Sequence, residues 1–304
     1  MSLLLGCLAG GMDLLAELRL LIVRHAGGAS RHRTTILDGV SISSVTEPTP
    51  PAAAMSEPSL AVVAQGVKRT VLNGVPYDYR TGQYLVVSLD LPVIGQALQA
   101  SADEPFAVFS MKLKPAAIAP LLLETVHAAR PPAFSGLAIS DATPELLDPV
   151  VRLLRLLDHP DDLRVLAPGL EREILWRLIT GEQGALVRQI GLASSSLTHI
   201  SRAIRWIREH YNEPVLVADL AALSGMSASS FHRHFRAATS MTPIQFAKQI
   251  RLQEARALLM TQPANVAEIG YLVGYESPSQ FSREYRRTFG VPPGRDAVRR
   301  TATV

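Results

Sequence analysis

A pattern of about twenty residues occurs twice in the last third of the chain, and it restricts the fold more than any other feature. The copies run over residues 217–236 and 266–287. In each copy a short helical apolar pattern is followed by a glycine, Gly225 or Gly274, and then by a second amphipathic helix. Glycine enters the left-handed backbone region at little cost, so each glycine marks a sharp turn between two helices. The pattern predicts two helix-turn-helix units.

The second helix of each unit has an inner and an outer face. Phe231 and Phe235, like Phe281 and Tyr285, are four residues apart and are expected to pack inward. Arginine can bond guanine O6 and N7 together, glutamine pairs with adenine, and serine reaches several base edges. Further arginines and helix N-termini would hold phosphates. We therefore expect these outward residues to contact DNA: Ser229, Ser230, His232, Arg233, Arg236, Ser279, Gln280, Ser282, Arg283, Arg286 and Arg287.

A helix is predicted between the two units. Thr242-Pro-Ile-Gln has capping-box spacing with proline at the first helical position, and the helical pattern continues to about Met260. A helix of about 19 residues is roughly 28 Å long at ~1.5 Å per residue. One turn of B-DNA is ~34 Å. One chain could therefore place two recognition helices in successive major grooves.

Charge and cysteine content agree with a DNA-binding segment in a reducing compartment. Residues 199–304 carry 14 Lys and Arg against 8 Asp and Glu, whereas the rest of the chain has 16 against 19. A basic segment beside a mildly acidic body is expected where one part contacts a polyanion. The single cysteine, Cys7, allows no disulfide within the chain and no cysteine-based zinc site. No stretch approaches ~20 uninterrupted apolar residues, so we expect a cytoplasmic protein without a membrane span.

The first half of the chain has β character between residues 60 and 113. Asn73-Gly74 is a two-residue hairpin signal, because both residues tolerate positive φ. Regularly spaced short strands favour a small sandwich or barrel. Residues 46–58 are predicted as a loop. Short apolar runs predict strands at residues 60–64, 69–72, 75–79, 84–88, 93–98 and 106–111.

Helical spacing dominates elsewhere in this half. Residues 12–26 predict a short amphipathic helix, and the pattern becomes helical after Ala116. The segment 143–190 is a candidate dimer surface, and packing against the β domain explains it equally well. Met12 is an alternative translation start to Met1.

Several motifs in the last hundred residues resemble the AraC/XylS family of bacterial transcription regulators. The resemblance covers about 201–299 and is carried by Leu220-Ala-Ala-Leu-Ser-Gly-Met-Ser, Pro243-Ile-Gln-Phe, Arg251-Leu-Gln-Glu-Ala-Arg-Ala-Leu-Leu, Ile269-Gly-Tyr-Leu-Val-Gly-Tyr-Glu-Ser-Pro-Ser-Gln-Phe-Ser-Arg and Phe289-Gly-Val-Pro-Pro. It implies DNA-contacting positions at Ser229, His232, Arg233, Pro278, Ser279, Gln280, Ser282 and Arg283. Pro278 has no N–H to donate.

The segments 57–69 and 82–93 resemble the cupin-like N-terminal domain of an AraC subgroup whose members answer to aldehydes or have no known effector. The resemblance implies an α+β protein with four parts: an N-terminal helix (1–35), a cupin-like β-barrel (36–130), a helical linker or dimerisation region (131–196) and an all-α double helix-turn-helix domain (197–304). The expected partners are double-stranded DNA, a small-molecule effector, a second copy of the chain and RNA polymerase, without a membrane. Candidate effector-lining residues in the barrel are Tyr77, Tyr79, Tyr84, Phe106, Phe109 and Met111.

Three regulatory hypotheses stay open, and enzyme chemistry is not favoured. The barrel senses a ligand, or it serves only for assembly, or Cys7 acts as a redox sensor. Cupin metal enzymes need inward histidines, and no histidine lies between Ile36 and His127. The sequence also has no glycine-rich phosphate loop and no serine-nucleophile elbow. We therefore expect no catalytic residue, no metal and no cofactor.

Overall fold

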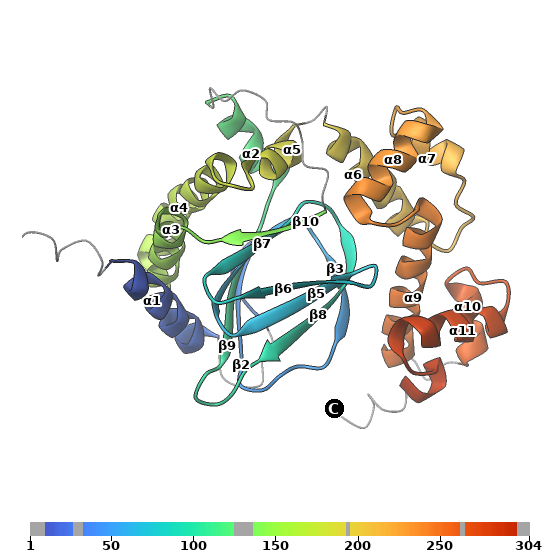
Figure 1. Cartoon of the computed structure of the whole chain (residues 1–304), viewed down its shortest axis with the longest axis horizontal. Coiled ribbons are helices and arrows are strands. Elements are labelled where there is room, and N and C mark those ends of the chain that lie inside the picture. Colours follow the sequence, from blue (N-terminus) through green and yellow to red (C-terminus); the bar gives the residue numbers. More distant parts are fainter. Residues whose placement is uncertain (1–9, 27–32, 125–135, 193–194, 262–264, 297–304) are drawn as a thin grey trace, which may run out of the picture. The chain divides into compact units, whose positions relative to one another are not determined.

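The computed structural model describes residues 10–26, 33–124, 136–192, 195–261 and 265–296. It divides into two compact units, Met1–Thr198 and His199–Val304 (Figure 1). Each unit has its own hydrophobic core, so each is described separately below. Cys7 lies outside the described residues.

Two antiparallel sheets form the centre of the N-terminal unit. One has six strands in the order β1-β2-β9-β4-β7-β10, and the other has four in the order β3-β8-β5-β6. Leu60, Tyr79 and Phe109 are among its largest fully buried side chains. The strands are β1 (Thr34–Leu37), β2 (Val40–Val45), β3 (Ala52–Ser56), β4 (Ser59–Gln65), β5 (Val67–Leu72), β6 (Val75–Arg80), β7 (Gln83–Val87), β8 (Leu91–Gln99), β9 (Phe106–Lys112) and β10 (Leu137–Asp141).

The structure confirms the predicted strands between residues 59 and 112 and the hairpin between β5 and β6. Asn73 and Gly74 have φ values of 50° and 80°, and Leu72 pairs with Val75 across the turn. Two positive φ values in succession match a turn whose twist follows that of the flanking strands. The predicted β-sandwich or barrel architecture is therefore present.

Two predictions about this unit were wrong. The predicted loop 46–58 contains β3, and the segment after Ala116, predicted as helical, contains β10. β3 is an edge strand that pairs only with β8, and β10 is an edge strand that pairs with β7. Backbone pairing supplied by a distant strand outweighs the weak local preference of Ala-rich and mixed sequences. Such pairing leaves no signal in a local window.

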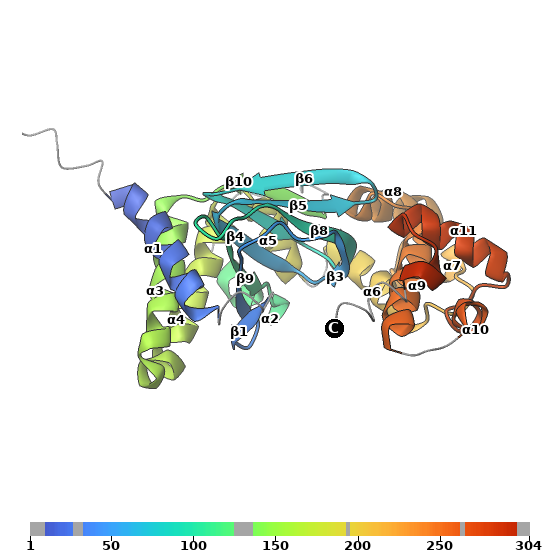
Figure 2. The same ribbon diagram turned by 90° about the horizontal axis from the view of Figure 1, so that it is seen from below.

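Five α-helices and one short 3-10 helix accompany the sheets among the described residues (Figure 2). α1 contacts α3 and strands β2, β4 and β9. Arg155 of α3 donates to both carboxylate oxygens of Glu17 on α1, at 2.6 and 2.7 Å. The helices are α1 (Gly10–His25), α2 (Pro115–Leu122), α3 (Pro144–Arg155), η1 (Leu156–Asp158), α4 (Pro160–Thr180) and α5 (Gly184–Gly191).

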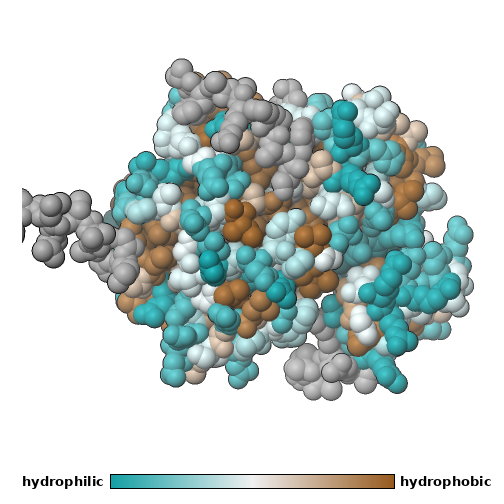
Figure 3. Space-filling view, viewed as in Figure 1, coloured by the Kyte–Doolittle hydropathy of each residue, from teal (hydrophilic) through white to brown (hydrophobic). Residues whose placement is uncertain are grey.

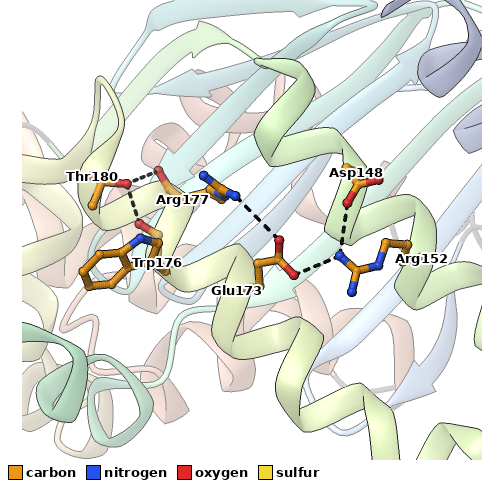
Figure 4. Close-up of polar contacts among 6 residues, drawn as sticks. All are labelled: Asp148, Arg152, Glu173, Trp176, Arg177 and Thr180. Atoms are coloured by element: carbon orange, nitrogen blue, oxygen red, sulfur yellow. Dashed lines mark hydrogen bonds and ion pairs between the residues drawn. The ribbon is translucent and has the colours of Figure 1, made fainter. Parts of the chain in front are cut away.

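Charged side chains link α3 to α4 along their exposed sides (Figure 4). Arg152 of α3 donates to Asp148 at 3.1 Å and to Glu173 of α4 at 3.0 Å. Arg177 lies 3.8 Å from the other carboxylate oxygen of Glu173. These pairs are exposed to solvent, so they fix geometry more than they stabilise the fold.

The face drawn in Figure 3 has separate hydrophobic patches interrupted by hydrophilic residues. No helix in the described part of the chain combines the length and the apolarity that a membrane span needs. Within the same residues, no group of histidine, cysteine and acidic side chains has the arrangement of a metal site.

The C-terminal unit is all-helical in its described residues. One face of α6 is buried through Ile200, Ala203, Ile204 and Ile207, as its helical spacing predicts. The helices are α6 (Ser196–Glu209), α7 (Val217–Leu223), α8 (Ala228–Thr239), α9 (Pro243–Thr261), α10 (Val266–Leu272) and α11 (Pro278–Phe289).

The burial of α1 can be tested with two apolar residues on opposite faces of this helix. Ile22 is 0% exposed and Leu20 is 60% exposed. We expect Ile22→Ala to cost about 2–4 kcal/mol of unfolding free energy, because it leaves a cavity in the core. Leu20→Ala should change it by no more than about 0.5 kcal/mol.

The measurement is urea denaturation followed by tryptophan fluorescence. The chain has two tryptophans, Trp176 and Trp206, so a Trp206→Phe background leaves only the reporter of the N-terminal unit. Equal effects of the two alanine substitutions would contradict the placement of α1 in the core.

Candidate nucleic-acid interface

The first helix-turn-helix unit consists of α7 and α8 joined by a tight turn. Gly225 has φ 62°, and Ser227 caps α8 by accepting a hydrogen bond from the Ser230 backbone N–H at 3.4 Å. Phe231 and Phe235 are fully buried, with ring centroids 5.4 Å apart. The buried aromatic pair fixes which face of α8 meets solvent, as the sequence predicts.

The second unit repeats this construction in α10 and α11. Gly274 has φ 87°, and Ser277 caps α11 by accepting from the Gln280 backbone N–H at 3.4 Å. Phe281 and Tyr285 are fully buried, with centroids 5.6 Å apart. Asn265 caps α10 through a 3.0 Å bond from the Ala267 N–H.

The predicted DNA-contacting residues lie on the outer faces of α8 and α11. None of the eleven is buried, and Ser230, Gln280 and Ser282 are partly covered. Arg283 donates from Nε to the Ser279 carbonyl at 3.3 Å, which leaves its terminal nitrogens for another acceptor. The exposed members are Ser229, His232, Arg233, Arg236, Ser279, Arg283, Arg286 and Arg287. Each of these side chains can therefore be reached by a ligand at the surface.

Helix α9 connects the two helix-turn-helix units and contributes buried side chains to the core of each. Its start has the complete predicted capping box: the Thr242 N–H donates to Gln245 Oε1 at 2.9 Å, and the Gln245 N–H donates to Thr242 Oγ1 at 3.2 Å. Phe246 packs edge-on against Phe235 of α8, with centroids 5.5 Å apart. Further along, Leu252 and Leu259 join the buried cluster of the second unit. The helix is thus a shared element, and it has the predicted 19 residues.

Arg251 of α9 ties two loops together, and sequence reasoning missed this role. Its guanidinium donates to the carbonyls of Tyr211 at 2.6 Å, Glu213 at 2.8 Å and Gly274 at 2.9 Å. The first two carbonyls belong to the connection between α6 and α7, and the third belongs to the turn of the second unit. Burial lowers the pKa of the Arg251 guanidinium, which keeps its charge as arginine does throughout proteins. The only local signal was a charged residue within the apolar pattern of α9.

The turn of the second unit lies directly against the α6–α7 connection. A Cβ added at Gly274 would come within 2.5 Å of the Asn212 carbonyl oxygen. At Gly225 an added Cβ would meet no atom within 4 Å. The two glycines look equivalent in sequence, but only Gly274 serves both turn geometry and close packing.

A hydrogen-bonded network on α11 holds one predicted base reader. Glu284 accepts from Lys248 at 2.8 Å, from the Tyr275 hydroxyl at 2.8 Å and from Gln280 Nε2 at 3.3 Å. Burial alone would raise the pKa of Glu284, but the bonds from Lys248, Tyr275 and Gln280 outweigh it and lower the pKa. Glu284 is therefore ionised at neutral pH, and it orients Gln280 while anchoring α11 to α9.

The end of the second unit is fastened to α9 by a buried ion pair. Arg256 donates to Asp296 at 2.9 Å, and the Tyr285 hydroxyl donates to the same carboxylate oxygen at 2.8 Å. The Arg256 guanidinium also lies 4.5 Å from the ring centroid of Phe289. These contacts fix α11 at its C-terminal end, as Glu284 does near its middle.

The six candidate effector-lining residues lie in or near the core of the N-terminal unit. Tyr79, Tyr84, Phe106, Phe109 and Met111 are buried, and Tyr77 is partly exposed. The Tyr79 hydroxyl is 3.4 Å from Thr70 Oγ1, and burial raises the pKa of Tyr84. Their role as ligand contacts remains a prediction.

Two family models match the chain. Residues 36–186 match the AraC-type transcriptional regulator N-terminus, and residues 220–297 match a helix-turn-helix domain. The first match lies in the N-terminal unit and the second lies in the C-terminal unit, and together they cover most of the chain.

Curated relatives and a solved structure resemble the chain as well. The transcriptional activator RhaS of Salmonella paratyphi A is 29% identical over 161 residues, which are 50% of this chain and 56% of RhaS. The uncharacterised regulator YdeC of Bacillus subtilis is 24% identical over 150 residues, 49% of this chain and 50% of YdeC. The matches thus span about half the length of these relatives. The crystal structure of an apo ToxT variant from Vibrio cholerae has the same fold, with a TM-score of 0.54 and 11% identity over 88% of this chain and 99% of ToxT.

The two turn glycines, Gly225 and Gly274, give a matched test of how the turn of the second helix-turn-helix unit packs against the α6–α7 connection. Gly225→Ala should cost about 1 kcal/mol, because alanine is strained at positive φ. Gly274→Ala carries the same strain and also clashes with the Asn212 backbone, so it should cost at least about 1–3 kcal/mol more. Urea denaturation in a Trp176→Phe background, which leaves Trp206 as reporter of the C-terminal unit, measures both. Equal costs would show that the close approach at Gly274 is absent.

Proposed function

The chain belongs to the AraC family of transcription regulators, and we propose that it binds double-stranded DNA sequence-specifically to regulate transcription. The observation that carries this proposal is the pair of helix-turn-helix units fixed to one connecting helix. Their recognition helices, α8 and α11, carry five exposed arginines: Arg233, Arg236, Arg283, Arg286 and Arg287.

We propose that α8 and α11 each enter a major groove. Arg233 and Arg283 hold corresponding positions in the two helices, each six residues after the capping serine, Ser227 or Ser277, and are the base readers. Arg286 and Arg287 near the end of α11 are suited to phosphate contacts, which position the protein without reading sequence. Gln280, oriented by Glu284, is suited to adenine. This role needs no catalytic residue, metal or cofactor.

The N-terminal unit is proposed to control DNA binding. A ligand that binds one arrangement of the regulator more tightly than another shifts the population toward it. The likeness to RhaS, named a transcriptional activator, supports activation and thus contact with RNA polymerase in the cytoplasm. The alternative is a ligand-independent regulator whose sheets serve only for assembly.

Fluorescence anisotropy with DNA from upstream of the protein's own gene tests the proposal. We expect Arg283→Ala to weaken binding to the preferred site by about 1–3 kcal/mol and to relax the preference at one base pair. Arg164→Ala, an exposed arginine of the N-terminal unit, is the control and should bind normally. An equal loss on all sequences would make Arg283 a phosphate contact, and salt-independent binding or none would refute the proposed function.

We further propose that α4 contributes to a homodimer, within the candidate dimer segment 143–190. Val165 and Leu166 on this helix are 70% and 50% exposed, so two neighbouring apolar side chains lie at its surface. The double substitution Val165→Asp with Leu166→Asp should halve the mass measured by light scattering. Leu216→Asp, at an equally exposed site in the C-terminal unit, should leave it unchanged. A wild-type monomer, or a mass that the double substitution does not alter, would rule out this interface.

A further inference from the structure

A cavity of about 760 Å³ opens on the N-terminal unit, where α1 meets the connections at one end of the strands. This volume is within the usual range of small-molecule sites, about 300–1,000 Å³. α1 supplies one wall, the β4–β5 and β6–β7 turns supply another, and the end of β8 with its following loop completes the rim. Residues that characterise these walls are Leu15, Arg19, Gly66, Arg80, Leu98 and Glu104.

Two arginines in this cavity have no partner among the residues that the structure describes. Within the described residues, neither Arg19 nor Arg80 has a side-chain hydrogen bond or an ion pair. Arg69 and Arg155 of the same unit, by contrast, are paired, with Asp78 at 2.6 Å and with Glu17. Glu104 is the single acidic residue in the lining, so the cavity carries a net positive charge.

The cavity wall is held by backbone hydrogen bonds. The Thr81 N–H donates to the Gly66 carbonyl at 3.1 Å, and the Gly82 N–H donates to the Val63 carbonyl at 2.9 Å. These bonds join the two turns that carry Gly66 and Arg80. A site whose walls are fixed before binding loses little conformational entropy when the ligand enters.

We propose that this cavity binds a small organic carboxylate, the effector of the regulator proposed above, on whose function this inference rests. The guanidinium group of arginine donates paired hydrogen bonds to the two oxygens of a carboxylate, and Arg19 and Arg80 would each offer such donors to the ligand. Leu15, Val67 and Leu98 give the cavity apolar surface for the body of the molecule. That apolar surface favours an organic acid over inorganic phosphate.

The position of Arg19 on α1 links a bound ligand to helix α3. Arg19 shares α1 with Glu17, which accepts two hydrogen bonds from Arg155 of α3. At the end of α1, Arg24 is 3.0 Å from Asp158, just after α3. A ligand that holds Arg19 therefore acts on a helix already fastened to α3, which packs against α4.

None of the six residues predicted from sequence to line an effector site lies in this cavity. That prediction followed aromatic residues within strands, and most of those side chains fill the core. The cavity instead forms from α1 and strand connections that are distant in sequence. No local pattern brings these segments together.

Thermal unfolding of the full chain tests the proposal with hexanoate, benzoate and 3-phenylpropionate, each compared with its amide. At about 10 mM, at least one carboxylate should raise the midpoint by about 2–4 °C, whereas its amide and inorganic phosphate should not. Arg19→Gln and Arg80→Gln should each weaken that carboxylate at least about tenfold. Arg164→Gln is the charge-matched control and should bind like the wild type.

Three outcomes would overturn the proposal: no carboxylate of the panel raises the midpoint, the amide acts as strongly as the acid, or binding survives both glutamine substitutions. The DNA assay is run on the same variants without carboxylate. Arg19→Gln and Arg80→Gln should then bind DNA like the wild type, because both residues lie in the N-terminal unit. If the cavity binds no carboxylate, the wild-type protein still binds DNA. If the proposed function is wrong, the wild-type protein does not bind DNA.

Discussion

The guanidinium of Arg251 is the contact on which the C-terminal unit depends. It donates to three backbone carbonyls outside the helices, two before α7 and one in the turn of the second helix-turn-helix unit. One charged side chain thus supplies the hydrogen-bond donors for three loop carbonyls, and its bonds to Tyr211 and Gly274 are partly buried. Arg251 lies on α9, the helix that both helix-turn-helix units share. Its contacts therefore also hold the turn of the second unit against the connection that precedes the first.

In the N-terminal unit, α1 likewise joins two neighbouring parts of the fold, the buried core and helix α3. α1 buries Leu18 and Ile22 in the core and bonds to α3 through Glu17, and its Arg19 reaches a cavity at the strand ends. A ligand in that cavity would bias the helical layer without entering the core. The proposed sensing residue on α1 is thereby linked, through Glu17 and Arg155, to α3, which packs against the proposed dimer helix α4.

Local signals in the sequence were sufficient for the helix-turn-helix units, because turn glycines, capping serines and aromatic pairs four residues apart all lie within twenty residues. The Asn73-Gly74 hairpin and the strands around it were predicted for the same reason. No local pattern indicated β3 or β10, which form strands through pairing with β8 and β7. Nor did any local pattern indicate the contacts of Arg251 or the cavity lined by Arg19 and Arg80, because the residues that they face lie far away along the chain. The outward residues of α8 and α11 lie at the surface as predicted, with Ser230, Gln280 and Ser282 partly covered, and their contacts with bases stay a prediction.

We propose that α8 and α11 of one chain read two successive major grooves. Guanine methylation interference on a DNA site selected by the full-length protein distinguishes this arrangement from binding through a single recognition helix, because N7 methylation blocks the major groove alone. We expect two clusters of interfering guanines per bound chain, about 10 base pairs apart on one face of the duplex. A single cluster for each bound chain would rule this arrangement out.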